Sequence, residues 1–317
     1  MHPTAAVAKR RPGATLALVA TVALAGCGGS AASAGTSIAL DGSSTVAPFS
    51  EAVAEEYRAE APGTAVSVGT SGTGGGFEKL CRGEIDVAGA SRPIAEEERD
   101  ACEAAGLGVV ELAVGLDGLA VVTSTDTAFV DCLTLDQLAS IFQEGGATRW
   151  DQVDSDLPAE PLAVFAPGTD SGTYDFFVEE VLGAPGEAGS LAARTDHTAS
   201  EDDNTLVQGL AGEFGSWGFI GLAYLRENAE RLRAIEVAGA DGVCVPPTPE
   251  TVADDSYPLS RPLFLYATDA ALARPEVADL LHFALAVAPE LIGEVGYIPA
   301  PPERYGASRA TLEEAAA

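Results

Sequence analysis

Residues 166–177 read APGTDSGTYDFF, and they decide the fold because a strand, a Gly-rich turn and the start of a helix meet in them. The apolar run Pro161–Phe165 precedes this stretch, and a Pro-Gly pair ends the run. Asp170 or Ser171 can act as the N-cap of the helix that follows. The first amides of a helix lack intrahelical partners and carry a partial positive charge, so with the hydroxyls of Ser171 and Thr173 they suit an anion. An ordinary capped helix would show the same pattern.

Two further stretches share this pattern. DGSST at 41–45 follows the apolar run Ser37–Leu40, and GTSGTGGG at 69–76 follows the alternating segment Ala65–Val68. Three strand-to-helix turns that are rich in glycine and hydroxyl groups can converge on one small oxyanion. None of them has the spacing of a nucleotide-binding P-loop or of a dinucleotide fingerprint.

The composition allows a large core and argues against nucleic acid as a partner. The chain has 317 residues, 47% of them hydrophobic, which is enough for about two domains. Its 17 basic and 48 acidic residues give a formal charge of −31, which opposes binding to nucleic acid or to an anionic membrane surface. A local anion site is still compatible with this charge, because exposed carboxylates farther away than about 10 Å are screened by salt.

The N-terminus has the pattern of a lipoprotein signal peptide over residues 1–26. A basic segment, Lys9–Arg11, precedes the apolar run Ala14–Ala25, which is too short to span a bilayer, and LAGC closes it at Cys27. This ending looks like a bacterial lipobox, which implies cleavage before Cys27 and attachment of lipid to its thiol. We expect residues 27–36 to form a flexible tether, with the lipid as the only contact to the membrane. A secreted or uncleaved chain is the alternative.

The rest of the chain alternates between strand and helix patterns, which indicates an α/β fold with a mostly parallel sheet. A flexible Asp-Gly at 117–118 interrupts an apolar strand, and there the chain can pass to a second lobe. The apolar strand Leu263–Tyr266 can bring it back near 260. We therefore expect one lobe from 37–116 plus 260–317 and a second lobe from 117–259, joined by two crossover strands that act as a hinge.

Four cysteines remain after Cys27, and an even number in an exported chain suggests two disulfides. Three pairings are possible. We expect Cys81–Cys102 and Cys132–Cys244, because each pair lies within one expected lobe. The cysteine spacings are too wide for paired metal ligands and histidine is scarce, so we expect no metal and no cofactor.

Five stretches, in this order, cover much of residues 36–310 and resemble the high-affinity phosphate-binding lipoproteins that feed bacterial phosphate ABC importers. They are DGSSTVAPF (41–49), GTSGTGGGFEKLCRGEIDVAGASRP (69–93), PGTDSGTYDFF (167–177), TASEDDNTLVQG (198–209) and YPLSRPLFLY (257–266). The resemblance implies a two-lobed periplasmic-binding-protein fold of the second type, with a dehydrated phosphate buried between the lobes.

The resemblance also implies the ligand-binding residues. Hydroxyls and amides of the three turns would hold the phosphate: Ser44, Thr45, Ser71, Thr73, Ser171, Gly172 and Thr173. The enteric branch of the family has an arginine just before its Gly-Ser-Gly-Thr turn, where this chain has Pro167. Arg92 is therefore our candidate for a bidentate contact to the oxyanion. A surface salt bridge is the alternative for this arginine.

The enteric branch has an aspartate after its Gly-Ala-Ser segment that this chain lacks. Phosphate near neutral pH carries a proton and sulfate does not, so a buried carboxylate acceptor favours phosphate. Asp170, or an aspartate of the run 202–203 such as Asp203, is a candidate acceptor. A solvated helix N-terminus is the other reading of that run. Selectivity for phosphate therefore rests on the resemblance.

Other functions are weaker matches. Residues 170–173, DSGT, have the form of an aspartic-protease site built on Asp170, but that chemistry needs a second copy. A serine hydrolase would need His197 or His282 as its base. We expect no enzyme. Sulfate, molybdate and arsenate remain alternative ligands, and a surface sensor or adhesin an alternative role. We expect a monomer on the outer face of the cytoplasmic membrane that binds inorganic phosphate and presents its closed form to a membrane permease.

Overall fold

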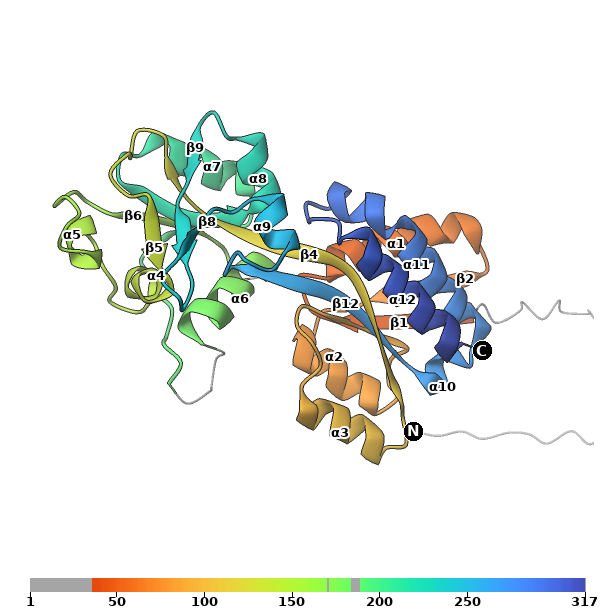
Figure 1. Cartoon of the computed structure of the whole chain (residues 1–317). Coiled ribbons are helices and arrows are strands. Elements are labelled where there is room, and N and C mark those ends of the chain that lie inside the picture. Colours follow the sequence, from red (N-terminus) through yellow and green to blue (C-terminus); the bar gives the residue numbers. More distant parts are fainter. Residues whose placement is uncertain (1–35, 170, 184–188, 317) are drawn as a thin grey trace, which may run out of the picture. The chain divides into compact units, whose positions relative to one another are not determined.

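Two neighbouring strands, β4 (Val109–Ser124) and β12 (Ser260–Thr268), run through the middle of the main sheet (Figure 1). The computed structural model describes residues 36–169, 171–183 and 189–316. Within them β4 pairs antiparallel with β12 as far as Gly118 and beyond it with β8 (Ser216–Gly221). The change of partner after Gly118 divides the sheet between two lobes, so that β4 and β12 are the two connecting strands.

The first lobe has a sheet with helices on both faces. Its further elements are β1 (Thr36–Gly42), α1 (Ala47–Glu60), β2 (Thr64–Val68), α2 (Gly72–Cys81), β3 (Val87–Ala90), α3 (Glu96–Ala104), α10 (Asp269–Leu272), α11 (Pro275–Glu294) and α12 (Pro302–Ala315). The strand order is β2-β1-β3-β12-β4, with β1 parallel to both of its neighbours. α1, α11 and α12 share one apolar core on one face, and α2 lies on the other (Figure 1), where its Phe77 and Leu80 pack against Tyr266. Because both faces are covered, β3 is apolar and buried throughout.

The second lobe continues the sheet in the order β4-β8-β6-β7. Its further elements are β5 (Cys132–Thr134), α4 (Leu135–Phe142), α5 (Trp150–Val153), β6 (Ala163–Pro167), α6 (Gly172–Phe177), the π-helix η1 (Val178–Leu182), β7 (Thr198–Ser200), α7 (Asp203–Gly212), α8 (Leu222–Glu227), β9 (Leu232–Ala234), β10 (Glu236–Ala238), β11 (Cys244–Val245) and α9 (Pro249–Ala253). An aromatic cluster fills its core, in which Phe177 stacks on Phe219 with 4.0 Å between ring centroids and Trp217 lies edge-on to both. A small sheet of β11, β10 and β5 completes the lobe.

The prediction of a break in the strand at Asp117-Gly118 is wrong, because β4 passes through these residues without interruption. Gly118 serves close packing here. A Cβ atom on it would lie 2.8 Å from Val252 Cγ2 and 3.5 Å from both Ile298 Cδ1 and Leu222 Cδ2. The small residue therefore lets three segments close around the crossing strand, which requires no flexibility.

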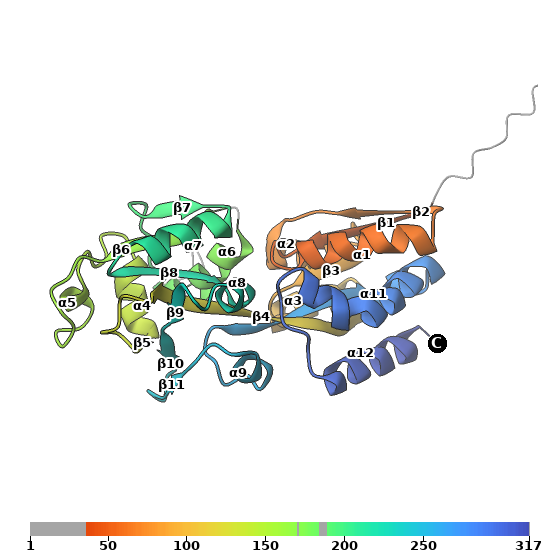
Figure 2. The same cartoon turned by 90° about the horizontal axis from the view of Figure 1, so that it is seen from above.

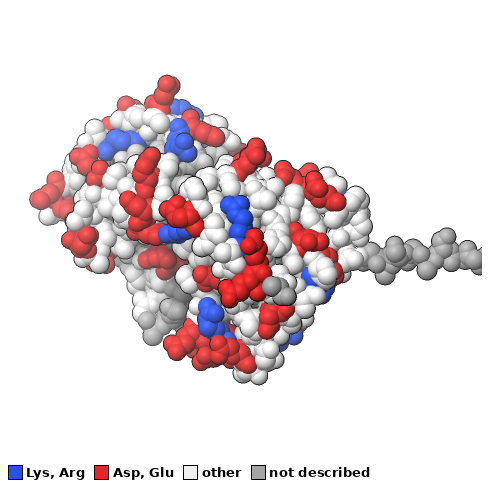
Figure 3. Space-filling view, turned by 45° about the vertical axis from the view of Figure 1, so that its right-hand side comes forward, with Lys and Arg blue, Asp and Glu red and all other residues white. Residues whose placement is uncertain are grey.

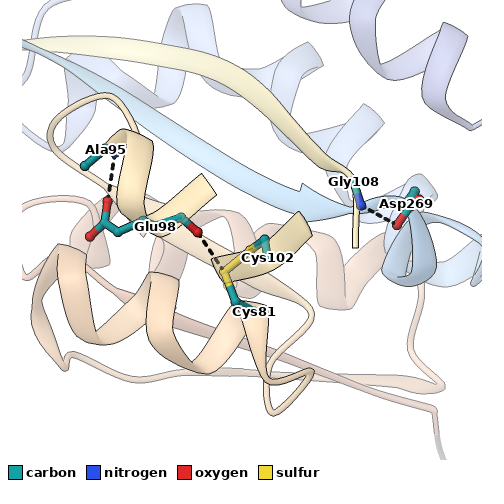
Figure 4. Close-up of a disulfide and its surroundings, with 6 residues drawn as sticks. All are labelled: Cys81, Ala95, Glu98, Cys102, Gly108 and Asp269. Atoms are coloured by element: carbon teal, nitrogen blue, oxygen red, sulfur yellow. Dashed lines mark hydrogen bonds between the residues drawn. A yellow bond between two sulfur atoms is a disulfide. The ribbon is translucent and has the colours of Figure 1, made fainter. Parts of the chain in front are cut away.

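Both disulfides join the cysteines that the sequence analysis paired. Cys81–Cys102 ties α2 to α3 (Figure 4), and Cys132–Cys244 ties β5 to β11. Figure 4 also shows Glu98 Oε2 accepting a hydrogen bond from the amide of Ala95, which fixes the start of α3. Each cross-link lies within one lobe and so leaves movement at the connecting strands unrestrained.

The predicted signal peptide at 1–26, the lipidation site Cys27 and the tether up to residue 35 lie outside the described residues. The tether was expected to extend to Thr36, where β1 already begins. None of the described helices has both the length and the apolar character that crossing a bilayer requires.

Removing either disulfide by paired Cys→Ser substitution should lower the free energy of unfolding, and removing Cys132–Cys244 should cost more. The two cross-links span 112 and 21 residues, and the loop-closure entropy then differs by about 1.5 kcal/mol. Urea unfolding of the two double variants measures this difference. Equal losses, or a larger loss on removing Cys81–Cys102, would contradict the loop-entropy argument.

Candidate anion-binding site

The starts of α1 and α2 border one cavity at the carboxyl ends of β1 and β2, and α6 of the second lobe closes it from the other side. The lining residues are Ser43, Ser44, Thr45, Gly72, Thr73, Ser91, Asp175, Glu179 and Arg261. The cavity measures about 30 Å³. A single water needs roughly 10–15 Å³ by this measure, so the space suits an ion of a few atoms and not a nucleotide.

Backbone amides at the two helix starts are free to bind an anion. The amides of Ser44 and Thr45 have no hydrogen-bond acceptor within the described residues, although the next amides, those of Val46 and Ala47, both bond to Ser43 O. Gly72 opens α2, and amides of a first helical turn have no intrahelical acceptor. Two helix N-termini therefore direct partial positive charge at the same cavity.

Hydroxyl groups supply the second set of donors. Thr73 Oγ1 lies 3.2 Å from Ser91 Oγ and accepts a hydrogen bond from the Ser91 amide at 3.3 Å. Ser91 is 7% exposed and Thr45 only 2%, so both hydroxyls are already withdrawn from water. These hydroxyls lose their contact with water when the protein folds, so anion binding does not have to supply the free energy of desolvating them.

Arg261 is the guanidinium of this cavity, and it contacts both lobes. Its Nη1 donates to Ser91 Oγ at 3.2 Å, and its Nη2 donates to Thr45 Oγ1 at 2.5 Å and to Gly172 O at 3.0 Å. The guanidinium carbon lies 4.0 Å from the ring centroid of Phe176 in α6. At 6% exposure Arg261 is buried, and its charge is therefore weakly screened.

Asp117 balances the charge of Arg261. The two residues face each other in the register of β4 and β12, and Arg261 Nε donates to Asp117 Oδ2 at 3.3 Å. Burial raises the pKa of the Asp117 carboxyl, and the guanidinium beside it opposes this shift. A buried guanidinium needs such a partner when no anion is bound.

The structure does not place Arg92, the predicted guanidinium contact, in the lining of the cavity. Both terminal nitrogens of Arg92 bond to Glu98, at 2.8 and 2.7 Å, and its side chain is 45% exposed and does not line the cavity. The salt-bridge alternative holds for this residue. Arg261 was missed although it lies in the quoted stretch YPLSRPLFLY. The sequence did contain a pattern that could have identified Arg261. Arg261 and Asp117 each lie in an otherwise apolar strand, and a buried charge there requires a partner of opposite charge.

Gly172 brings the backbone of the second lobe close to the start of α1. Thr45 Oγ1 donates to its carbonyl at 3.3 Å, and a Cβ atom on Gly172 would lie 2.6 Å from Thr45 Oγ1 and 2.9 Å from the Thr45 backbone. Any side chain here would hold α6 away from the start of α1. Glycine at this position therefore allows the lobes to meet.

Two carboxylates lie among these donors. Asp175 Oδ2 accepts a hydrogen bond from Ser44 Oγ at 3.2 Å, a second contact between α6 and the start of α1. Glu179 follows on η1, and loss of hydration raises its pKa while the guanidinium of Arg261 opposes the shift. Neither residue was among the candidates predicted from the sequence.

Ser71, another predicted ligand-binding residue, does not line the cavity. Its amide and hydroxyl both donate to Asp41 Oδ1, at 2.9 and 2.7 Å, while Lys79 Nζ binds the other carboxylate oxygen at 2.6 Å. Desolvation opposes ionisation of Asp41, but these bonds outweigh it and lower its pKa. Asp41 thus holds the turns before α1 and α2 together, and Ser71 is a structural residue.

The remaining predicted residues fall in several places. Ser171 caps α6, its hydroxyl accepting from the Thr173 amide at 3.2 Å, and neither side chain lines the cavity. Asp203 opens α7 and does not line the cavity. Asp170 lies outside the described residues.

The described lining residues can bind and desolvate an anion. No histidine lines the cavity, and His197 packs against the ring of Phe142 instead, with 5.2 Å between centroids. Across residues 36–169, 171–183 and 189–316 there is no group of three or more His, Cys, Asp or Glu side chains that could hold a metal ion.

Comparison with known proteins agrees with this geometry. Residues 29–286 match the model of the PBP superfamily domain. Protein SphX of Synechococcus elongatus is 45% identical over 275 residues, which are 86% of this chain and 80% of that protein. The phosphate-binding protein PstS of Staphylococcus saprophyticus is 33% identical over 305 residues, 95% and 93% of the two chains.

Solved structures show the same fold. A possible phosphate binding protein from Planctomyces limnophilus superposes with a TM-score of 0.84 at 42% identity, covering 89% of this chain and 99% of the other. An ABC-type phosphate transport receptor from Vibrio cholerae gives a TM-score of 0.65 at 26% identity, covering 82% and 99%. The two-lobed α/β fold expected from the sequence is confirmed.

Asp203→Asn should stabilise the protein at neutral pH. Burial, together with the charge of Asp202, raises the pKa of Asp203 from its usual 3.8 to about 6. The ionised form is therefore disfavoured in the folded state, and the variant should gain about 1–2 kcal/mol at pH 7.5 after allowance for solvent screening. The gain should shrink as the pH falls through 6 and vanish below about 4, where the carboxyl is protonated in both states.

Thermal unfolding of this variant between pH 4 and 8 measures the effect. Asp136→Asn is the matched control, because it removes the same charge from the first turn of another helix, α4, where the side chain is exposed. A gain that is independent of pH, or one shared by the control, would contradict the assigned cause.

Proposed function

The chain belongs to the PBP superfamily and, within it, to the family of the SphX and PstS proteins, and we propose that it captures inorganic phosphate between its lobes and delivers it to an ABC importer. The observation that carries this proposal is the position of Arg261. One buried guanidinium, hydroxyls of the first lobe and a carbonyl of the second meet around a cavity the size of a small ion.

Phosphate binding would be coupled to closure of the hinge. In this structure the lobes already touch through Ser44 with Asp175, Thr45 with Gly172, and Arg261 with Gly172. A ligand that bonds to both sides of these contacts stabilises the closed form by its differential affinity for it. The permease would then bind the closed form of the protein, which is the form that holds phosphate.

The carboxylates of the cavity supply a basis for selectivity. A phosphate that carries one proton can donate a hydrogen bond to Asp175 or Glu179, whereas a sulfate would place an acceptor against an acceptor. These two residues replace Asp203 as candidates for the acceptor that the sequence analysis sought. Sulfate, molybdate and arsenate are less favoured ligands on this argument and on the names of the relatives.

Long-range electrostatics would not assist capture. Acidic side chains outnumber basic ones over the face shown in Figure 3, in keeping with the formal charge of −31. Binding would depend on amides, hydroxyls and the Arg261 guanidinium that act within a few ångströms. Association should therefore be faster at higher salt, which screens the repulsion.

The remaining parts of the proposal follow from the sequence. Lobe 1 comprises 37–116 plus 260–317 and lobe 2 comprises 117–259. The signal peptide 1–26 is cleaved, lipid on Cys27 holds the chain at the outer face of the cytoplasmic membrane, and the protein acts as a monomer. No enzymatic activity is expected, since the aspartic-protease pattern at Asp170 lacks the second copy that its chemistry needs.

Calorimetric titration of the purified chain with phosphate and with sulfate tests the function. Phosphate should bind one to one, and sulfate should bind at least about 100-fold more weakly, because an acceptor left facing an acceptor costs about 3 kcal/mol. Absence of phosphate binding would reject the function. Sulfate binding of equal strength would reject the selectivity and leave a general oxyanion-binding protein.

Arg261→Lys should weaken phosphate binding by about 2–4 kcal/mol, roughly 30- to 1,000-fold, because a single ammonium cannot replace the forked donor pattern. The lysine retains a positive charge next to Asp117, which protects folding. Arg92→Lys is the matched control and should change the affinity by less than about threefold, since this arginine is in an exposed salt bridge. The reverse order of effects would restore Arg92 as the anion-binding residue.

A further inference from the structure

A second hollow lies at the contact between the lobes, outside the anion site. It is formed by Ala223, Tyr224 and Glu227 of α8, in the second lobe, and by residues 293–296 at the end of α11, in the first lobe. We call it the interlobe notch. Its volume is about 210 Å³, which is below the roughly 300–1,000 Å³ of pockets for drug-sized ligands and of the order of one long side chain.

The notch is built from both lobes and lies close to the crossing strands, since a Cβ atom on Gly118 would be 3.5 Å from both Leu222 and Ile298, which adjoin its two walls. A Cβ atom on Gly296 would lie 4.0 Å from Ala223 Cβ, which is ordinary van der Waals contact across the lobe boundary. Figure 2 shows α8 at the edge of the second lobe that faces the first. Any opening at β4 and β12 that separates α8 from the end of α11 therefore removes one wall of the notch.

The charges around the notch favour a cation. Glu227 and Glu294 are exposed at its two sides, and neither has an ion pair or hydrogen bond within the described part of the chain. The 20-residue helix α11 ends here, and the carbonyl groups of a last helical turn carry partial negative charge. No basic side chain lines the hollow.

The shape of the lining favours a cation on an apolar stem. The side chains of Ala223 and Val295 provide an apolar surface, and Tyr224 adds an aromatic ring beside the carboxylates. Lysine and arginine bury their methylene stems on such surfaces while the charged end stays near water, and both groups bind well over an aromatic ring. A free inorganic cation would use only the carboxylates.

We propose that the interlobe notch receives a lysine or arginine side chain of the membrane permease, and that the permease thereby recognises the closed form. This inference rests on the proposed function, because it identifies the surface through which captured phosphate is delivered. In the open form the two carboxylates separate and the cation loses its site. The permease can then distinguish loaded from empty protein without contacting the anion.

The test places a cation in the notch from this chain itself. Gly293→Arg is suitable because a Cβ atom there meets nothing within 4 Å, and Gly306→Arg on α12 is the matched control with the same open surroundings. A second variant, Glu227→Gln with Glu294→Gln, removes the charges; Glu51→Gln with Glu55→Gln on α1 is its control. Each full-length variant is expressed in place of the native protein, and uptake of radiolabelled phosphate by the cells is measured. Calorimetry then gives the phosphate affinity of each purified variant.

Both notch variants should reduce phosphate uptake at least about tenfold while the affinity for phosphate stays within twofold, and both controls should behave as the native chain. Native uptake in the notch variants would overturn the proposal. Equal loss in the controls would also overturn it, because the effect would then follow total charge. Failure of the native chain to bind phosphate would instead show that the proposed function is wrong, so the two failures can be told apart.

Discussion

The buried ion pair between Arg261 and Asp117 is the interaction on which the rest of this structure depends. Each residue lies on one of the two strands that connect the lobes, and the register of β4 and β12 places them opposite each other. A guanidinium at 6% exposure is tolerated only when a carboxylate and further acceptors compensate for its lost hydration. The charged groups of the binding site therefore lie on the two strands that connect the lobes.

This placement has a consequence for the electrostatics of anion binding. Because Asp117 lies against Arg261, the pair adds little net charge to the cavity, and the guanidinium acts there mainly as a short-range donor beside the amides and hydroxyls of Ser44, Thr45 and Thr73. Such neutral dipoles are strong at short range and weak beyond it. A chain with a formal charge of −31 can in this way hold an anion without a basic surface.

Two different sites are formed where the lobes meet, the anion cavity and the interlobe notch. On one side Gly172 reaches Thr45 and Arg261 because it has no side chain, which completes the anion cavity. On another, α8 meets the end of α11 and forms the interlobe notch. Both depend on the same movement about β4 and β12. Capture and recognition by a partner are thus linked through rigid elements, and no contact between the two sites is required.

The sequence by itself determined the alternation of strands and helices, the three hydroxyl-bearing turns and the cysteine pairing, because these follow from local periodicity, helix capping and the division into lobes. Tertiary structure alone decided which side chains of those turns face the ligand. Ser71 hydrogen-bonds to Asp41, and Arg92 forms a salt bridge with Glu98. The guanidinium that lines the cavity belongs instead to Arg261, 169 residues farther along the chain than Arg92. The reason is physical: a hydroxyl or guanidinium binds the nearest acceptor that folding provides, and that acceptor is set by strand register and lobe contact, which no local pattern encodes.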